Sequence, residues 1–114
     1  MAERVLNGKI AIVTGAGRGL GRTMALGLLR AGANMTMVER DTDVLDEVVR
    51  EAQQIEGAGQ VVACQGDVTS EKDAADAVVA TIERFGGLDI LVNNAALGPQ
   101  TFQPSNLEPR PRIW

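Results

Sequence analysis

The glycines at alternate positions in residues 14–21, which read TGAGRGLG, offer the clearest chemistry in this sequence. They lie between a short apolar segment and a segment with helical periodicity. Glycine permits a tight turn and the close approach of a ligand, and the start of a helix presents free N–H groups with a partial positive charge of ~0.5. This combination favours a phosphate-binding turn over a plain connection between a strand and a helix.

The spacing of these glycines distinguishes several kinds of phosphate-binding turn. A Walker loop does not fit, because Leu20 occupies its second glycine position counted from Gly15, and Arg22 replaces the lysine after Gly21. The pattern G-x-G-x-x-G also fails, since it requires glycine at Leu20 or at Arg22. The pattern that fits is T-G-x-x-x-G-x-G, with glycine at positions 15, 19 and 21.

Composition excludes several other chemistries. The sequence has no His and no Tyr, and its single cysteine is Cys64, so a Ser-His-Asp triad, a His-ligated metal, a zinc cluster and a disulfide framework lack their residues. The net charge of −4 argues against nucleic acid or an anionic membrane as the main partner. Neither a signal-like start nor a run of ~18 apolar residues is present, so we expect a cytoplasmic chain.

A parallel sheet is predicted to position the glycine turn, because short apolar segments alternate with helical patterns. The expected strands are residues 9–14, 34–38, 60–64 and 88–92, and the expected helices begin near residues 19, 43 and 70. Strands that alternate with helices of this length imply right-handed crossovers. The sequence therefore predicts an α/β fold with a Rossmann-like, doubly wound parallel sheet.

Each predicted helix has one apolar stripe and a recognisable end. Gly32 is suited to end the first helix and Gly86 with Gly87 the third, and Ser70 with Asp73 is predicted to form a capping box at the start of the third. The expected stripes are Leu20, Met24, Leu28 and Ala31 in the first helix, Val44, Leu45, Val48, Val49, Ala52 and Ile55 in the second, and Ala74, Val78, Ile82 and Phe85 in the third.

The composition changes near Gly98, because all four prolines follow it. Residues 1–98 are predicted to form a partial Rossmann domain, and residues 99–114 an irregular Pro-rich tail without helix or strand periodicity. With the strand order 3-2-1-4, a sheet truncated after the fourth strand leaves residues 90–92 at an open edge. Such an apolar edge could pair with a second copy of the chain.

The glycine pattern resembles that of the short-chain dehydrogenase/reductase family. Three further segments share the resemblance: Glu39 at the end of the second strand, Asp67 with Val68 after the third, and the Asn-Asn-Ala of residues 93–95 after the fourth. The resemblance covers about residues 5 to 98. It implies the dinucleotide-binding part of an NAD(P)-dependent oxidoreductase, which transfers hydride between nicotinamide and an alcohol or carbonyl substrate.

The resemblance also implies a cofactor and a set of residues that bind it. Glu39 would accept hydrogen bonds from ribose hydroxyls and repel a 2′-phosphate, which favours NAD. Arg18 and Arg40 are cations that could reach a phosphate, so NADP is disfavoured without being excluded. The implied cofactor-binding residues are Gly15, Arg18, Gly19, Leu20, Gly21, Glu39, Arg40, Asp67, Val68, Asn94 and Ala95.

The family's catalytic Ser and Tyr-x-x-x-Lys have no counterpart here, so no catalytic residue and no metal ligand is assigned. Without them the acid–base step loses a factor of ~10²–10⁴, and we expect the isolated chain to be inactive, with substrate bound only in a full-length form. Two alternatives stay open. One is an S-adenosylmethionine-binding domain, since residues 15–19 also satisfy G-x-G-x-G; the other is a non-catalytic interaction module that pairs through the open strand edge.

Overall fold

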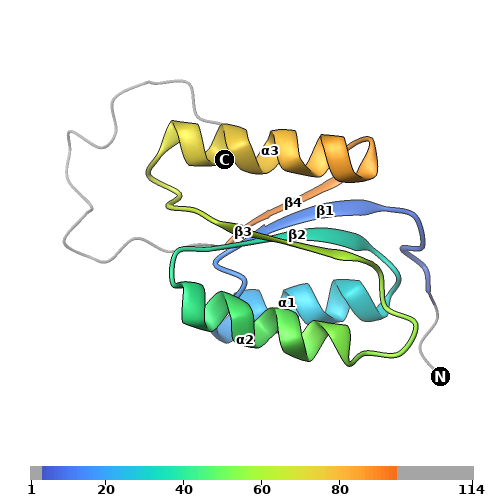
Figure 1. Cartoon of the computed structure of the whole chain (residues 1–114). Coiled ribbons are helices and arrows are strands. Elements are labelled where there is room, and N and C mark those ends of the chain that lie inside the picture. Colours follow the sequence, from blue (N-terminus) through green and yellow to red (C-terminus); the bar gives the residue numbers. More distant parts are fainter. Residues whose placement is uncertain (1–3, 95–114) are drawn as a thin grey trace.

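The computed structural model describes residues 4–94, so the predicted boundary at residue 98, the tail and Ala95 lie outside the described residues. Four strands alternate with three helices: β1 (Ile10–Thr14), α1 (Gly19–Arg30), β2 (Asn34–Glu39), α2 (Thr42–Gln53), β3 (Val61–Gln65), α3 (Glu71–Phe85) and β4 (Ile90–Asn93). All strands pair in parallel in the order β3-β2-β1-β4 (Figure 1). The predicted α/β, Rossmann-like fold is confirmed.

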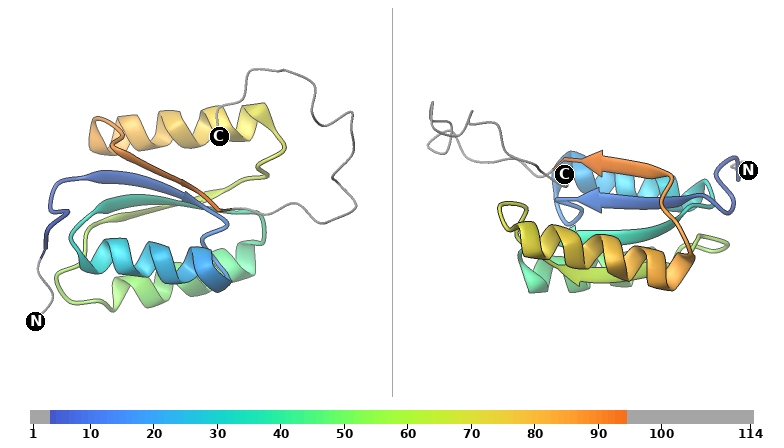
Figure 2. Two further views of the ribbon diagram at one scale, coloured as in Figure 1. Left: turned by 180° about the vertical axis from the view of Figure 1, so that it is seen from behind. Right: turned by 90° about the horizontal axis from the view of Figure 1, so that it is seen from above.

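The helices cover both faces of the sheet, with α1 and α2 on one face and α3 on the other (Figure 2). The larger apolar core lies between the sheet and the helix pair, and a smaller one around Ile12, Val38 and Ala77 lies under α3. β1 buries side chains toward both cores, which explains why its sequence is continuously apolar. Arg22 of α1 also pairs with Glu47 and Glu51 of α2, so a polar contact reinforces the packing of these two helices.

The buried stripe predicted for α2 is confirmed, but the one predicted for α1 is correct only in part, because Leu28 packs against the larger core and Leu20 does not. α1 buries Gly21, Ala25, Leu26 and Leu29, whereas Leu20 is 65% exposed. Apolar residues lie on more than one face of this helix. The face that contains Gly21 is buried because it packs against the glycine turn. That face carries small residues near its start, which allows α1 to lie close to the turn.

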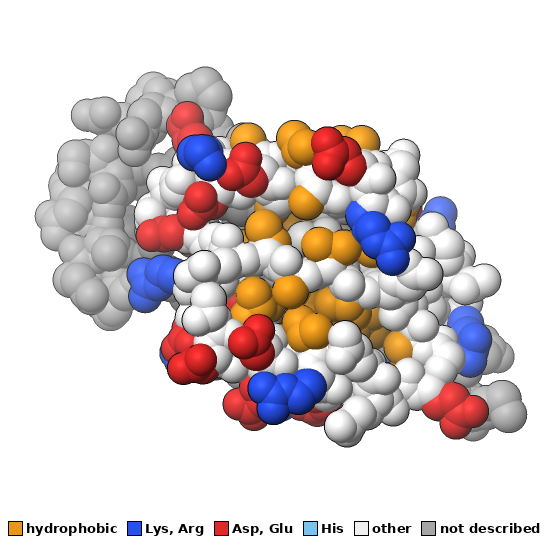
Figure 3. Space-filling view, in the orientation of Figure 1, with side chains coloured by type: hydrophobic (Ala, Val, Ile, Leu, Met, Phe, Trp, Pro, Cys, Tyr) orange, Lys and Arg blue, Asp and Glu red, His pale blue; other side chains and the backbone are white. Residues whose placement is uncertain are grey.

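The buried face of α3 also differs from its predicted stripe. Ala74 is buried as predicted, but its neighbours on that face are Ala77 and Thr81, while Ile82 is 49% exposed. The Thr81 hydroxyl is buried because it meets the Thr36 hydroxyl of β2. A polar residue therefore occupies the buried face, Val78 packs at the margin of the smaller core, and Val79 and Ile82 are exposed. Figure 3 shows apolar side chains gathered over α3 and between α3 and α2.

The predicted helix ends are confirmed in part. Gly32, with a φ of 101°, follows the end of α1, and Gly86, with a φ of 88°, ends α3 in the left-handed conformation that favours glycine. Ser70 accepts a hydrogen bond from Asp73 N–H, as a capping box requires. The reciprocal bond is absent, because the Asp73 carboxylate accepts from Asp67 N–H instead. This second bond ties the loop after β3 to the start of α3.

Within residues 4–94, β4 pairs with β1 alone, so its other edge has no strand partner in this part of the chain. Ile90 and Val92 pack at the margin of the larger core, while Leu91 is 42% exposed. None of the described helices is long and apolar enough to cross a membrane.

Candidate functional site

The carboxyl ends of β1, β2 and β4 meet at one edge of the sheet. The pairing register places Thr14 of β1 opposite both Val38 of β2 and Asn93 of β4. The segments that follow these three residues therefore start side by side. The glycine turn, Glu39 and Asn94 are brought together in this way, although they are far apart in the sequence. Ligands of open parallel sheets bind at this edge, where the strand order reverses.

Two glycines of the turn have backbone conformations that other residues rarely adopt. Gly15 has a φ of 62° and Gly19 a φ of 52°. A Cβ on Gly21 would lie 2.1 Å from the Gly15 carbonyl oxygen and 2.4 Å from Asn94 Nδ2, so a side chain at this position has no room. The glycines at positions 15, 19 and 21 thus shape the turn and let it pack against the end of β4.

The start of α1 is suited to an anion. Its N-cap residue, Arg18, makes no side-chain capping bond, and its first turn holds no acidic residue. By contrast, α2 is capped by Asp41 and α3 by Ser70. A Cβ at Gly19 would meet no atom within 4 Å, so there is open space at this helix start. The site combines unused N–H groups, the positive end of a helix and room for a phosphate.

Thr14 fixes the end of β4 to the start of the glycine turn. Its buried hydroxyl accepts a hydrogen bond from Asn94 N–H at 3.0 Å and lies 3.2 Å from the side-chain oxygen of Asn93. These contacts hold Asn94 where its side chain approaches Gly21. Thr14 is therefore a positioning residue of the site.

The Glu39 carboxylate is held at the mouth of the turn by two backbone groups. Oε2 accepts a hydrogen bond from Gly17 N–H at 3.2 Å, and Oε1 accepts one from Asp41 N–H at 3.3 Å. A Cβ on Gly17 would lie 2.2 Å from Val44 Cγ1, so this glycine is required by packing against α2. Gly17 was not among the predicted site residues, although its place among the alternating glycines was a signal.

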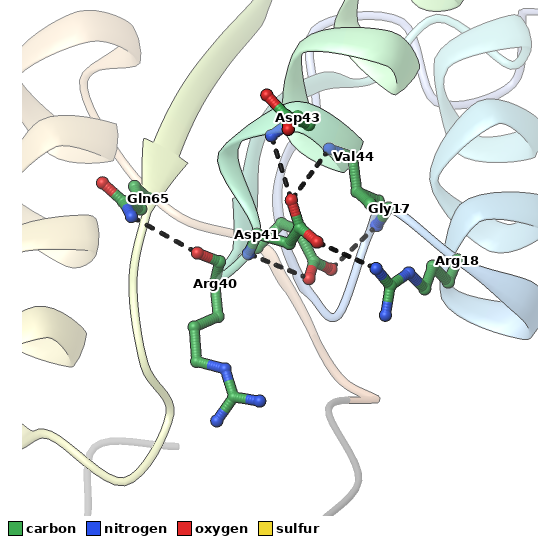
Figure 4. Close-up of polar contacts among 8 residues, drawn as sticks. Gly17, Arg18, Arg40, Asp41, Asp43, Val44 and Gln65 are labelled. Carbon is green, nitrogen blue, oxygen red and sulfur yellow. Dashed lines mark hydrogen bonds and ion pairs between the residues drawn. The ribbon is translucent and has the colours of Figure 1, made fainter.

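The two predicted arginines behave differently. The Arg18 guanidinium forms an ion pair with the Asp41 carboxylate at 2.9 Å. The Arg40 side chain is exposed and extends away from Asp41, while its carbonyl oxygen accepts a hydrogen bond from Gln65 Nε2 (Figure 4). Asp41 was absent from the predicted site, and only the fold brings it to Arg18.

A comparison with known protein families identifies the chain. The family model described as short chain dehydrogenase matches residues 9–110. The chain belongs to the short-chain dehydrogenase family. The T-G-x-x-x-G-x-G turn, Glu39 and Asn94 lie within the matched residues, and the resemblance noted in the sequence is confirmed.

Individual short-chain dehydrogenases support this assignment. The 7alpha-hydroxysteroid dehydrogenase of Escherichia coli (strain K12) is 42% identical over 98 residues, which make up 85% of this chain and 38% of that protein. The solved structure of a 7 alpha-hydroxysteroid dehydrogenase complexed with NADH and 7-oxo glycochenodeoxycholic acid matches with a TM-score of 0.73 and 40% identity, over 80% of this chain and 35% of that one.

A metagenomic short-chain oxidoreductase in complex with NADP matches with a TM-score of 0.76 and 31% identity, over 90% of this chain and 48% of that one. Structures similar to this chain therefore include one solved with NADH and one solved with NADP. The chain spans less than half the length of these relatives.

The remaining predicted residues within 4–94 lie near the same edge of the sheet. Asp67 and Val68 follow β3, next to the end of β2. Hydrogen bonds from the hydroxyl and the N–H of Thr69 lower the pKa of Asp67, and the charge of Arg40 lowers it further. Leu20 is exposed in the first turn of α1. The structure thus places the turn, Glu39, Asn94, Arg40 and Asp67 along one edge.

Proposed function

We propose that this chain is the dinucleotide-binding part of an NAD(P)-dependent oxidoreductase that transfers hydride between nicotinamide and an alcohol or carbonyl substrate. The observation that carries the proposal is the uncapped start of α1 beside a turn shaped by Gly15, Gly19 and Gly21. A pyrophosphate placed there would receive backbone N–H groups and the helix dipole. The family assignment favours a dinucleotide over S-adenosylmethionine as the ligand.

We further propose that NAD is preferred over NADP. The Glu39 carboxylate is oriented by Gly17 N–H and Asp41 N–H, and each of its oxygens has a second lone pair for a ribose hydroxyl. The negative charge would repel a 2′-phosphate at the same place. The similar structures solved with NADH and with NADP support a nicotinamide dinucleotide in general, so the preference rests on Glu39.

Titration of the purified chain with ADP-ribose and NADH tests the proposed site. Gly19→Val should abolish binding, because the new side chain strains a φ of 52° and fills the open space at the start of α1. Gly8→Val is a matched control, since Gly8 has a φ of 83°, has open space around its Cβ position, and precedes β1 at the end far from the site. Equal binding by the Gly19 variant and the control would remove this turn from the site.

We propose that the chain alone catalyses no dehydrogenase turnover and that a substrate binds only in a longer form. The printed sequence has neither Tyr nor His to act as the general base, which supports this expectation. NADH absorbance measured with NAD and a panel of alcohols is the test. Turnover that copurifies with the chain and disappears in Gly19→Val would contradict the proposal.

We propose that the chain acts in the cytoplasm. As a separate property, we propose that it self-associates through the β4 edge. The support for self-association is the unpaired side of β4 among residues 4–94 and the exposure of Leu91. Sedimentation at increasing concentration should show dimers that Leu91→Lys weakens. A monomer at all concentrations would contradict the proposed self-association.

A further inference from the structure

Asp41 connects two parts of the site through its two carboxylate oxygens. Oδ1 accepts hydrogen bonds from Asp43 N–H at 3.0 Å and Val44 N–H at 3.3 Å, which caps α2. Oδ2 accepts a hydrogen bond from Arg18 Nη2 at 2.9 Å (Figure 4). Asp41 therefore caps α2 and also holds the guanidinium of Arg18, which occupies the N-cap position of α1 without capping it.

Without this contact Arg18 would be a free cation beside the Glu39 carboxylate. Its side chain is 69% exposed, and among residues 4–94 its one ion pair is with Asp41. Glu39 lies next to both residues, because its carboxylate accepts hydrogen bonds from Gly17 N–H and Asp41 N–H. The cluster of Arg18, Glu39 and Asp41 thus contains one cation and two anions, and it is net negative.

We propose that Asp41 is a specificity-determining residue that holds Arg18 away from the 2′-phosphate of an adenosine ligand. This inference rests on the proposed function, since it places the adenosine ribose at Glu39. Arg18 can pair with Asp41 or with a 2′-phosphate, and the contact with Asp41 occupies the guanidinium before a ligand arrives. Asp41 also adds a second negative charge beside Glu39, which disfavours a dianionic phosphate.

The ion pair is exposed, so a single substitution should release Arg18. Asp41→Asn is suited to this purpose. Its side-chain oxygen can still cap α2, because Asn is as good an N-cap as Asp, while the amide nitrogen that replaces Oδ2 is a donor and cannot accept a hydrogen bond from Arg18. The substitution therefore separates the role of Asp41 in the cap from its hold on Arg18.

The probes are 5′-AMP and 2′,5′-ADP, which differ only in the 2′-phosphate, and their dissociation constants are measured by NMR titration at low salt. Asp41→Asn should tighten binding of 2′,5′-ADP by about three- to fivefold and change binding of 5′-AMP less than twofold, as expected for an exposed pair. High salt should reduce this gain in affinity for 2′,5′-ADP. Adding Arg18→Gln to Asp41→Asn should remove most of it.

Asp43→Asn is the matched control, because it removes the same charge from the first turn of α2 without touching Arg18. In Asp43→Asn, the ratio of the dissociation constants for 5′-AMP and 2′,5′-ADP should stay within twofold of the wild-type ratio. Asp41→Ser, which also retains an N-cap oxygen without charge, should repeat the effect of Asp41→Asn.

An unchanged ratio in both Asp41 variants, with 5′-AMP still bound, would overturn this inference alone. An equal gain in Asp43→Asn would also overturn it, since the effect would then come from general charge. Failure of the wild-type chain to bind 5′-AMP would instead overturn the proposed function, and this inference with it.

Discussion

The hydroxyl groups of Thr36 and Thr81 form a buried hydrogen bond of 2.6 Å that joins β2 to α3. Thr81 also donates to the Ala77 carbonyl oxygen at 2.7 Å, so Thr36 is the donor in the bond between the two hydroxyls. Both side chains are fully buried. A polar contact therefore fixes the position of α3 on the sheet, in a face whose other buried residues are small.

Thr81→Val should lower the free energy of unfolding by about 1–3 kcal/mol, because it leaves the buried Thr36 hydroxyl without its partner. Thr36→Val should have a smaller effect, since the Thr81 hydroxyl keeps its bond to Ala77. The double variant should be closer to wild type than the sum of the two single losses. Urea unfolding of the wild type, the two single variants and the double variant measures the coupling energy between the two substitutions. Strictly additive losses of unfolding free energy would contradict the coupling.

Gly21→Ala should disrupt the site by a direct clash. The added Cβ would lie 2.1 Å from the Gly15 carbonyl oxygen, which is backbone and cannot move without changing the turn. We expect a loss of about 1–3 kcal/mol of stability and weaker binding of ADP-ribose. Gly27→Ala, in the same helix with open space around its Cβ, should gain up to ~1 kcal/mol. Similar unfolding midpoints for the two variants would contradict the packing described for Gly21.

Glu39→Ala should lower the preference for NAD over NADP by about tenfold, a free-energy difference of ~1.4 kcal/mol. The substitution removes both the charge that repels a 2′-phosphate and the acceptors for ribose hydroxyls. Glu39→Gln should relieve the repulsion while keeping one acceptor, so it should weaken NAD less than Glu39→Ala does. Isothermal titration calorimetry gives the ratio of the dissociation constants for NAD and NADP. Equal losses of affinity for the two dinucleotides would refute the role of Glu39.

Asp67 should titrate below its ordinary pKa of 3.8, because the hydroxyl and the N–H of Thr69 donate to its carboxylate. A carboxyl group whose pKa is lowered by folding stabilises the fold above pH 3.8, and this contribution is lost as the pH falls through the lower folded-state value. Thr69→Ala removes the hydroxyl donor and should move the pKa of Asp67 upward. NMR titration of the Asp67 carboxyl carbon measures the shift, and an identical curve in Thr69→Ala would contradict its cause.

The local pattern of the sequence predicted the sheet, the order of elements and the glycine turn. Alternation of short apolar runs with helical periods depends on residues close in sequence, and so does the left-handed backbone of Gly15 and Gly19. The ends of α1 and α3 at Gly32 and Gly86 were predictable for the same reason.

The tertiary structure alone decided which side chains meet at the site. Glu39 reaches Gly17, and Arg18 reaches Asp41, because the register of β1 with β2 places the ends of these strands side by side. Sequence spacing gives no distance between such segments, so the partners of Glu39 and Arg18 could not be derived from it.

Packing also decided which row of each helix was buried. Leu20 and Leu28 lie on one apolar row of α1, yet the fit of Gly21 against Gly15 leaves Leu20 exposed and Leu28 only partly buried. In α3, the bond between Thr36 and Thr81 places a hydroxyl in the core and leaves Ile82 exposed. A helical period shows which residues share a row, but the atoms that a helix meets across the fold determine which row is buried.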